Sequence, residues 1–493
     1  MNNNSGIDWM DEVMRSKDRL LADLVALLRY ESVKDPGSSA VGKPMGKGIS
    51  EALQFMLDLS AGEGFHARNL EGYAGYAEYG PSAPGAKAYI AVLSHLDVVP
   101  ATGAWTTPPF EPSIRDGRIF ARGAIDDKGP AMAAFYALVI VKRLGLPLKH
   151  NVRLIFGTDE EHASSCMQRY RELEPPPLCG FTPDAEFPIV NAEKGQINTR
   201  LILQRSERTP GAGEHSEPGA GMFELVRFDA GGIANMVPEA AQATVRGQRQ
   251  ELATMAAAYE VYCSNEGLTG RTESSGGEMV FSMAGKSAHG MEPQKGVNAG
   301  LELLHFLRGY RYQPDAESFV ACVDDSMYHD SFGRKFGVEM EDAITGSLTI
   351  NTGIMIFDPE GESFFHLNLR YPACGEDAWI LRQIAEKAGR YGFIVDQPIL
   401  KKPHAVPADH PMIPILQRVY QEASGLEPEL LSTGGGTYGS QIPNGVAFGP
   451  LFPGRAYMAH QPDEYMEIED LLRATAIYAR AIYELANMDE IGG

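Results

Sequence analysis

The sequence predicts an α/β fold, in which one domain has a mostly parallel sheet flanked by helices and a second, inserted domain is α+β. An apolar run at residues 89–100, bounded by turn residues, is typical of a buried strand in a parallel sheet. It is followed by a helical stretch at 130–144 and a second strand at 152–157, a succession that predicts a parallel strand–helix–strand unit. After Glu193 shorter strand-like and helix-like stretches alternate, which indicates an α+β insert.

Length and composition place the chain among soluble globular proteins. Its 493 residues are enough for two or three domains, and 44% hydrophobic with 22% charged residues is ordinary. Lys and Arg number 43 against 65 Asp and Glu, a net charge of −22. So acidic a surface repels nucleic acid and anionic membranes, and we expect neither as a partner.

Cysteine usage and the termini predict a cytoplasmic protein. The cysteines are scattered, odd in number and without a CxxC pair, which argues against a disulfide framework or a thiolate zinc site; they are Cys166, Cys179, Cys263, Cys322 and Cys374. The first residues, MNNNSGIDWMDEV, lack the basic start and apolar core of a signal peptide. The longest apolar stretch, 130–141, is too short to span a bilayer.

The first 192 residues are read as alternating helices and strands. Apolar spacings of three and four predict a helix over 8–29. A loop at 35–48, a helix at 49–59 and strands within 65–79 precede the central strand. Asp116-Gly117 between apolar residues predicts a hairpin turn. We expect the buried helix 130–144 to begin at Pro130, since proline is favoured at the first helical position.

The insert is predicted over residues 193–401, between a first domain of 1–192 and 402–493. Expected strands are 197–203, 223–228, 279–283, 348–351 and 364–370, and expected helices are 251–265, 297–308 and 376–390. A Gly/Glu/Pro-rich insertion at 205–221 is predicted to be a surface loop, and 312–345 to be irregular. After the return, helices are expected at 411–424 and 467–487.

Acids and histidines follow the predicted strands of the first domain. Residues two apart on a strand share a face, so His95 and Asp97 would point the same way. A metal-binding histidine needs its second ring nitrogen held, often by a carboxylate, although a buried histidine satisfied by an acid is the simpler alternative. In open parallel sheets such strand ends form sites. The whole set of ligand-type residues is His95, Asp97, Asp126, Asp127, Glu160, Glu161, Asp184 and His460.

These oxygen and imidazole groups suit zinc, which binds them at about 2.0–2.2 Å. Two ions about 3.5–4 Å apart need a bridging carboxylate. Each residue alone has a structural alternative: Asp126 as a helix N-cap, Glu160–Glu161 as a solvated strand end, Arg370 as half of a salt bridge, and His289 as a surface histidine. The glycines at 434–436 could form only a turn.

Nine motifs in order carry a resemblance to a known family. They are SHLDVVP, ARGAIDDKGP, FGTDEE, TPDAEFP, GGIANMVP, GKSAHGMEPQKGVNAG, NLRYP, GGGTYG and the histidine of YMAHQ. In this order they resemble the PepV-like zinc dipeptidases, within the superfamily of aminoacylases, carnosinases and glutamate carboxypeptidases. The resemblance runs from about residue 8 to 485 and implies a catalytic domain (1–192 and 402–493) and an inserted lid domain (193–401).

The resemblance implies a role for each matching residue. His95 and Asp184 would hold one zinc ion, Glu161 and His460 the other, and Asp126 would bridge both; Mn²⁺ or Co²⁺ could substitute. Asp97 would orient His95, and Glu160 would be the general base. The Asp126–Asp127 peptide bond would be cis. His289 would stabilise the oxyanion, while Asn235, Arg370 and backbone amides around Gly435 would bind the carboxylate of the substrate.

The resemblance implies hydrolysis of dipeptides with a free N-terminus, with Xaa-His and β-alanyl dipeptides among the candidates. Two alternatives are a deacylase or carboxypeptidase acting on N-acyl amino acids, and a silent binding protein that keeps the fold. Against the second, no ligand position is replaced. His162, where relatives commonly have a small or hydroxyl residue, and the 205–221 insertion depart from the family pattern. We expect a monomer with a small peptide as its partner, with a dimer as the alternative.

Overall fold

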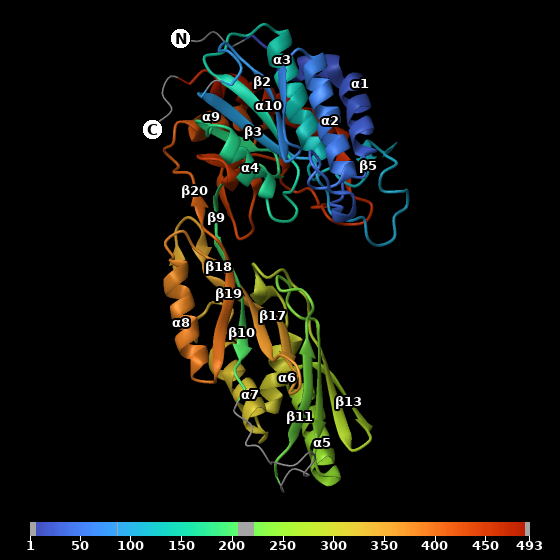
Figure 1. Ribbon diagram of the computed structural model, residues 1–493, viewed down its shortest axis with the longest axis vertical. Coiled ribbons are helices and arrows are strands. Elements are labelled where there is room, and N and C mark those ends of the chain that lie inside the picture. The colour runs from blue at the N-terminus through green and yellow to red at the C-terminus, as the bar shows by residue number, and fades with distance from the viewer. Residues whose placement is uncertain (1–5, 86, 206–220, 489–493) are drawn as a thin grey trace. The chain divides into compact units, whose positions relative to one another are not determined.

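The computed structural model describes residues 6–85, 87–205 and 221–488, which form two compact units (Figure 1). Unit 1 comprises Met1–Ala192, Ala405–Ser432 and Gly436–Gly493, and unit 2 comprises Glu193–His404 and Thr433–Gly435. The chain therefore leaves unit 1 after Ala192, returns to it at Ala405, and contributes the short segment Thr433–Gly435 to unit 2 before it ends in unit 1. As assignments of a catalytic domain and a lid, the boundaries at 192 and 402 stay predictions.

Unit 1 is built on a mixed sheet, in which the described strands follow the order β1-β2-β6-β3-β7-β22-β9-β20, with β21 also paired to β9. Strand β3 runs parallel to β6 and β7, and β7 runs parallel to β22, as the strand–helix–strand pattern predicted. The bounds are β1 His66–Leu70, β2 Ala74–Tyr79, β3 Tyr89–His95, β6 Asn151–Gly157, β7 Cys179–Thr182, β9 Ile189–Glu193, β20 His404–Ala405, β21 Leu430–Thr433 and β22 Gly445–Ala447.

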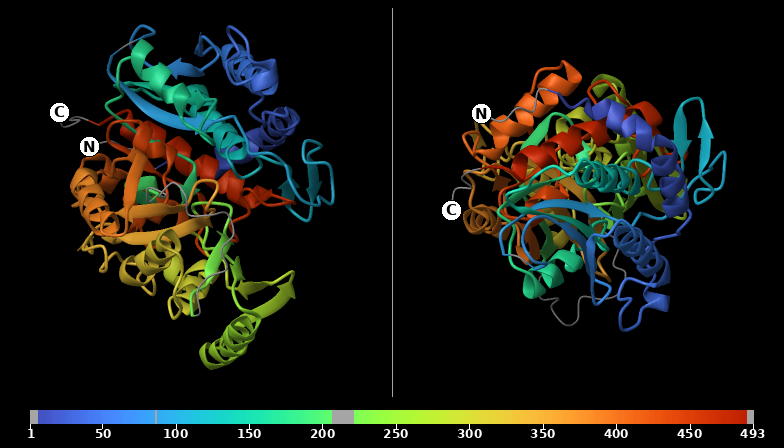
Figure 2. Two further views of the ribbon diagram at one scale, coloured as in Figure 1. Left: turned by 60° about the horizontal axis from the view of Figure 1, so that its bottom comes forward. Right: turned by 90° about the horizontal axis from the view of Figure 1, so that it is seen from above.

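Helices cover this sheet, and α3 is the most buried of those described. They are α1 Trp9–Leu28, α2 Lys47–Gly62, α3 Lys128–Arg143, α4 Ser165–Leu173, α9 Met412–Ser424 and α10 Ile468–Leu485. Helix α3 packs against α1 and the C-terminal α10, and Figure 2 shows α3 and α10 side by side. The prediction that α3 begins at Pro130 was wrong. It begins at Lys128 after Asp127, so Pro130 lies within its first turn, where proline is still tolerated.

A small three-stranded sheet joins two distant parts of unit 1. Strands β4 (Ser113–Arg115) and β5 (Arg118–Phe120) form the predicted hairpin, with positive φ at Asp116 and Gly117. Strand β24 (Tyr465–Glu467) pairs with β5. The chain just before α10 is thereby held against the chain that leads into α3. A further pair consists of β8 (Ala185–Glu186) and β23 (Pro450–Leu451).

Unit 2 contains an antiparallel sheet, whose described strands follow the order β13-β14-β12-β11-β17-β18-β10-β19. Their bounds are β10 Gly195–Leu203, β11 Glu224–Ala230, β12 Ala240–Arg246, β13 Thr269–Ser275, β14 Glu278–Ala284, β17 Thr349–Phe357, β18 Phe364–Tyr371 and β19 Phe393–Lys401. The helices are α5 Arg249–Glu266, α6 Ala299–Leu307, α7 Pro314–Ser326 and α8 Asp377–Gly389, and β15 (Glu341–Asp342) pairs with β16 (Gly346–Ser347). Its core includes Phe228, Phe281 and Phe319, all fully buried.

The secondary structure of unit 2 differs in part from the elements predicted from the sequence. The region predicted to be irregular, 312–345, contains helix α7, which begins at Pro314 and buries Ala316, Phe319, Val320 and Val323 on one face. Strands β12, β13 and β19 were not predicted. Most of the predicted 205–221 loop, residues 206–220, lies outside the described residues.

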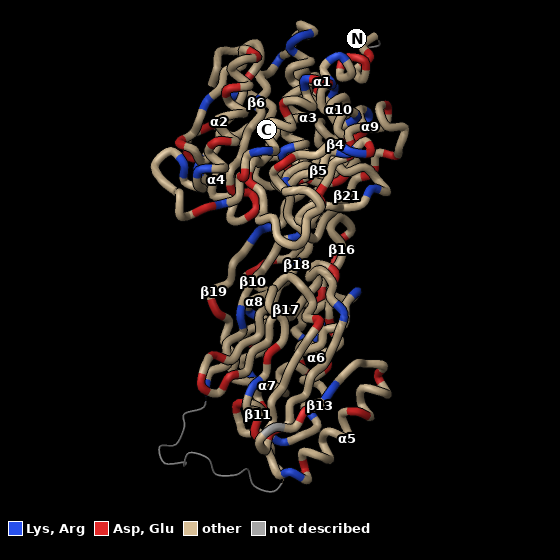
Figure 3. Tube along the Cα trace, turned by 90° about the vertical axis from the view of Figure 1, so that its right-hand side faces the viewer, with Lys and Arg blue, Asp and Glu red and all other residues tan. Residues whose placement is uncertain are grey.

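The distribution of charged residues and the hydropathy of the helices agree with the composition of the chain. In the view of Figure 3 the positions of acidic and basic residues are scattered along the traces of both units, and the full sequence carries a net charge of −22. Within the described part of the chain, no helix is both long and apolar enough to cross a bilayer.

Candidate metal centre and substrate-binding groups

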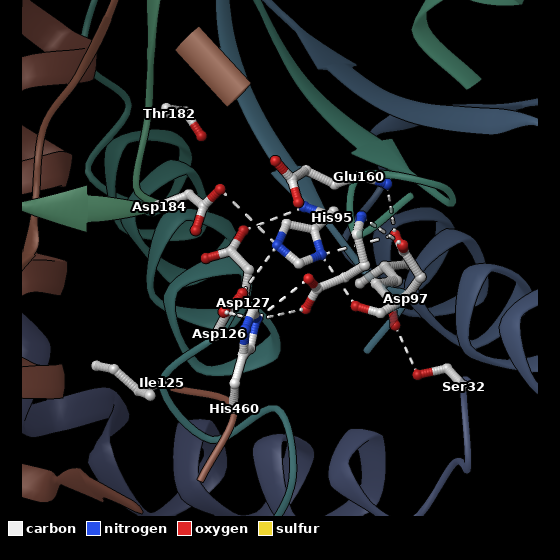
Figure 4. A network of polar contacts seen from close by, with 12 residues as sticks. Ser32, His95, Asp97, Ile125, Asp126, Asp127, Glu160, Thr182, Asp184 and His460 are labelled. Carbon is white, nitrogen blue, oxygen red and sulfur yellow. Dashed lines mark hydrogen bonds and ion pairs between the residues drawn. The ribbon is translucent and has the colours of Figure 1, made fainter. Parts of the chain in front are cut away.

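The predicted ligands of unit 1 come together where its parallel strands end (Figure 4). His95 is the last residue of β3, Glu160 and Glu161 follow β6, and Asp184 follows β7. Asp126 precedes α3 and His460 lies in the loop before β24. The carboxyl ends of parallel strands share one edge of a sheet, which is why residues far apart in the sequence meet here.

Asp126 lies between the two histidines. Its Oδ1 is 3.0 Å from Nε2 of His95, and its Oδ2 is 3.0 Å from Nε2 of His460. Glu161 completes the second side, with Oε2 3.1 Å from the same nitrogen of His460. Asp184 completes the first, with Oδ2 3.8 Å from Nε2 of His95. The arrangement is the one that a carboxylate shared between two cations requires.

The electrostatics of this cluster favour positive charge. His95 is fully buried. Burial alone would lower the pKa of His95, but the acids around it, Asp126 first and then Asp97 and Asp184, outweigh burial and raise its pKa well above the usual value. Hydrogen bonds with Asp126 and Glu161 raise the pKa of His460 to about 10. Burial raises the pKa of Asp184 well above its usual value, despite the opposing effect of His95. So many acids, buried together, are stable only with cations or protons among them.

The donor set fits metal binding. Nε2 of His95 is buried and has no hydrogen-bond partner of acceptable geometry, even though Asp126 is near. Two groups of ligand atoms lie within 4.8 Å of one another: His95, Asp126 and Glu161 in one, and His95, Glu160 and Asp184 in the other. Imidazole nitrogen with carboxylate oxygen is the ligand chemistry of zinc and similar divalent ions.

Asp97 holds His95 differently from the prediction. Nδ1 of His95 lies 2.9 Å from the backbone carbonyl oxygen of Asp97, and 3.6 Å from its carboxylate. The carboxylate instead accepts hydrogen bonds from the backbone N–H groups of Glu160 and Glu161, at 3.2 and 3.1 Å. Asp97 therefore orients the histidine through its main chain, and positions the two glutamates through its side chain.

Glu160 and Glu161 lie in a turn that follows the end of β6. Burial raises the pKa of Glu160 to about 7; His95 opposes this change, and Glu161 and Asp126 add to it. A carboxyl group with such a pKa suits general acid–base catalysis near neutral pH. Its position near His95 and Asp184 would also allow it to act as a ligand.

Several residues that support the centre were not assigned such a role from the sequence. Asp127, a ligand-type residue in the sequence, is fully buried, and its carboxylate accepts the backbone N–H of His95 at 3.1 Å. The Asp126–Asp127 bond is cis, as predicted. Glu464 bonds to the Asp126 loop, and Tyr438 of the GGGTYG motif packs its ring edge against His95, with centroids 5.9 Å apart. The sequence signal for Glu464 was weak, an acid four residues after His460.

In unit 2, His289 is held in one tautomer. The backbone N–H of Met291 donates to Nδ1 of His289 at 3.2 Å, so neutral His289 carries its proton on Nε2. Burial, and then the positive charge of Arg370, lower the pKa of this histidine. A neutral imidazole with a free N–H is able to donate a hydrogen bond to an anionic oxygen.

Arg370, Gly434 and His289 are linked through Met291. Thr349 lies opposite Arg370 in the β17–β18 register and donates a hydrogen bond to the carbonyl oxygen of Met291. Gly434 packs directly against Met291. Arg370 is 5% exposed, with Nε donating to Asn368 at 3.1 Å, and burial lowers its pKa to about 10, so it remains protonated near neutral pH.

The two remaining predicted binding groups, at Gly435 and Asn235, make local backbone contacts. The backbone N–H of Gly435 donates to the Thr433 hydroxyl at 3.0 Å. The backbone carbonyl of Asn235 accepts the N–H of Gly290 at 2.7 Å, which fixes the 235 loop beside the segment that carries His289. These groups help to shape unit 2 around His289 and Arg370.

Known proteins share this sequence and fold. "Putative dipeptidase YtjP" of Bacillus subtilis is 43% identical over 488 residues, covering 97% of this chain and all of that protein. Among solved structures, the di-peptidase Dug1p of Saccharomyces cerevisiae aligns over 98% of both chains with a TM-score of 0.55 and 13% identity. Aminoacylhistidine dipeptidase of Vibrio alginolyticus aligns over 94% of this chain and 96% of its own, with a TM-score of 0.55 and 15% identity.

The family itself is identified by sequence. Residues 91–484 match the family model described as Peptidase family M20/M25/M40. This segment holds every predicted ligand, from His95 to His460, together with His289 and Arg370. By this match and by the identity to its relative, the chain belongs to peptidase family M20/M25/M40.

Proposed function

We propose that this protein is a metal-dependent dipeptidase that hydrolyses dipeptides with a free N-terminus. The observation that carries the proposal is Asp126, which presents one carboxylate oxygen at 3.0 Å to each of two histidines inside a cluster of acids. A relative 43% identical over nearly the whole chain bears the name dipeptidase, which supports this substrate class.

In the proposal, two divalent ions bind around Asp126. His95, Asp126 and Asp184 would hold one ion, and Asp126, Glu161 and His460 the other. Zinc, when bound, would polarise the scissile carbonyl and acidify the attacking water. Mn²⁺ and Co²⁺ accept the same nitrogen and oxygen ligands.

Glu160 is the proposed general base. It is buried among the ligands, and its pKa of about 7 allows it to take a proton and to release it near neutral pH. It would accept the proton of the attacking water and deliver it to the nitrogen of the leaving amine, since the amine must be protonated to depart. Asp97 fixes the backbone of Glu160 and so directs this carboxyl group.

Unit 2 supplies the proposed substrate-binding groups. The guanidinium of Arg370 is buried and charged, and suits the carboxylate of a dipeptide by charge-assisted hydrogen bonding. The Nε2–H of His289 would donate to the oxygen that becomes negative during attack. The name of the Vibrio neighbour, an aminoacylhistidine dipeptidase, makes Xaa-His dipeptides a first choice for assay.

A substrate panel tests the proposal. Purified protein is incubated with free dipeptides, including Xaa-His and β-alanyl dipeptides, with the same peptides N-acetylated, and with N-acyl amino acids. We expect cleavage of free dipeptides that stops after chelation and returns with Zn²⁺, Mn²⁺ or Co²⁺. Preference for the acylated compounds would support the deacylase or carboxypeptidase alternative. Undiminished cleavage after complete metal removal would contradict the proposed chemistry.

A further inference from the structure

We propose that Glu464 is a positioning residue that fixes the bridging carboxylate of Asp126 relative to His460. Its carboxylate is completely buried and bonds to the main chain on which Asp126 is mounted. The inference rests on the proposed metal centre, but it concerns how the centre is held together rather than which bond is cleaved.

The contacts of Glu464 divide between its two oxygens. Oε1 accepts the backbone N–H of Ile125 at 3.0 Å and that of Asp126 at 3.3 Å. Oε2 accepts Nη1 of Arg122 at 2.5 Å, an ion pair whose partners are 1% and 0% exposed. The Glu464 side chain therefore contacts the backbone of Asp126, which carries the central carboxylate, and also the guanidinium of Arg122, four positions before Asp126.

The backbone of Glu464 strengthens the same link. Its carbonyl oxygen accepts the N–H of Ala121 at 3.1 Å, and the next residues form β24, which pairs with β5. His460 lies four residues before Glu464 in the same segment, with its φ in the left-handed region at 67°. The Asp126 loop and the His460 loop are thus tied at one point, close to both ligands.

This link has a direct consequence for the ligands. Asp126 must keep one oxygen near His95 and the other near His460, since both distances are 3.0 Å. A carboxylate on a loop that moved by an ångström would lose one of these positions. Groups that orient metal ligands typically contribute about 10–100-fold to metal affinity.

Fold stabilisation is the competing explanation, because a buried ion pair broken on one side leaves an uncompensated charge. The test therefore removes both charges together. Arg122→Met/Glu464→Gln keeps a carbonyl oxygen that can accept the two N–H groups. Arg122→Met/Glu464→Leu has similar volume but no acceptor. Replacing both members of a buried pair by groups of similar size is often neutral for stability.

The readout is zinc affinity, measured by competition with a chromogenic chelator, together with thermal stability. We expect zinc to bind about 10–100-fold more weakly to Arg122→Met/Glu464→Leu than to Arg122→Met/Glu464→Gln, with similar melting temperatures. Glu467→Gln is the matched control, because Glu467 pairs with Arg118 at 2.7 Å between β24 and β5, the two strands next to Glu464 and Arg122. It should leave zinc affinity unchanged. Equal zinc affinity in the two double variants would overturn the inference.

Hydrogen exchange gives a second readout on the unaltered protein. In the metal-free wild type, the amides of Ile125 and Asp126 should exchange slowly, because Glu464 accepts both. Exchange as fast as in an open turn would also overturn the inference. Neither readout uses peptide cleavage. A protein that binds zinc but cleaves no dipeptide would therefore disprove the proposed function without deciding the role of Glu464.

Discussion

The Nε2 atom of His95 lies 3.0 Å from Oδ1 of Asp126, yet the two do not form a hydrogen bond of acceptable geometry. Nε2 of His95 is fully buried, and the side chain of Asp126 is 12% exposed. Two ligand atoms that face a common metal ion also lie close together without pointing at each other. The structure thus favours a shared cation over a histidine–aspartate pair.

If Asp126 bridges two ions, its loss should affect both. Asp126→Asn removes the negative charge that the two sites share and replaces one of the two bridging oxygens by an amide nitrogen, so zinc affinity should fall at both sites. Asp184→Asn should weaken one site alone, since Asp184 lies beside His95 and belongs to the group of ligand atoms formed with His95 and Glu160. Titration calorimetry measures the zinc affinity of each site, and metal analysis of the purified protein gives the number of ions per chain. Asp116→Asn, in the β4–β5 turn, is a control that removes an acid from a position with positive φ that asparagine accepts. Saturation of the wild type at one ion per chain would contradict the dinuclear centre.

Substitutions of the two adjacent glutamates should have different effects on kcat and on zinc binding. Glu160→Gln keeps the shape but removes the base, and should lower kcat by about 10²–10⁴-fold while zinc content is retained. Glu161→Gln should lower zinc affinity as well, because Glu161 lies 3.1 Å from Nε2 of His460 at the second site. Measuring kcat and zinc content in both variants shows which glutamate is the base and which is the metal ligand. If Glu160→Gln empties a site and Glu161→Gln does not, the roles are reversed.

The protonation of His289 should depend on Arg370. Because burial and then Arg370 lower its pKa, His289 should titrate below the ordinary value of about 6.5. The unfolded chain then takes up this proton first, so the stability that His289 contributes is complete above that ordinary value. It is lost as pH falls through the lower pKa of the folded state. NMR titration should show the midpoint of His289 rising in Arg370→Gln. His366, whose pKa is lowered by burial and Arg200, should not respond.

Arg370 should discriminate between substrates with and without a carboxylate. A hydrogen bond to a charged group contributes about 1.5–3 kcal/mol, so Arg370→Lys should raise KM for a free dipeptide about 10–100-fold. The corresponding dipeptide amide should be a poor substrate for the wild type and should change little in the variant. Arg200→Lys, which alters an exposed pair with Glu362 and Asp396 in the same sheet, is the control. Equal KM changes for acid and amide would exclude carboxylate recognition by Arg370.

We expect His289 to act within its own chain. Glu160→Ala and His289→Ala proteins, each inactive alone, should stay inactive when mixed, because neither chain would then hold a complete set of groups. The mixture is assayed over a range of protein concentrations, with a wild-type sample diluted in parallel. Recovery of activity would show that one chain supplies the histidine to another and that the active form is an oligomer.

Part of the candidate metal centre could be predicted from strand ends, because the ends of parallel strands converge. His95, Glu160, Glu161 and Asp184 end or follow such strands, whereas Asp126 and His460 lie in loops and were assigned through the family resemblance. The role of Asp97 could not be predicted. The i, i+2 rule holds along a strand, but β3 ends at His95, so the direction of the Asp97 side chain depends on the turn beyond it. Glu464 was missed for another reason, since its partners lie more than three hundred residues away in the sequence and no local pattern marks them.

The insert was harder to predict than the first domain. Strand β13 reads TGRTESS and has little hydrophobic alternation, because it lies at the edge of its sheet and pairs only with β14 on the described path. Helix α7 carries a readable signal, a proline at its first position and apolar residues at helical spacing. It was obscured by the glycines and acids that follow in 324–346.

The ribosome synthesises the chain from its N-terminus, and this order matters for a sheet whose strands come from early and late parts of the sequence. Strand β22, residues 445–447, lies between β7 and β9, and α10 packs on α3. A nascent chain that ends before residue 445 already contains His95, Asp126 and Asp184, but lacks a central strand, the covering helix and His460. Contacts this distant in sequence form late and slowly. We therefore expect the metal centre to be complete only in chains that already contain β22, His460 and α10.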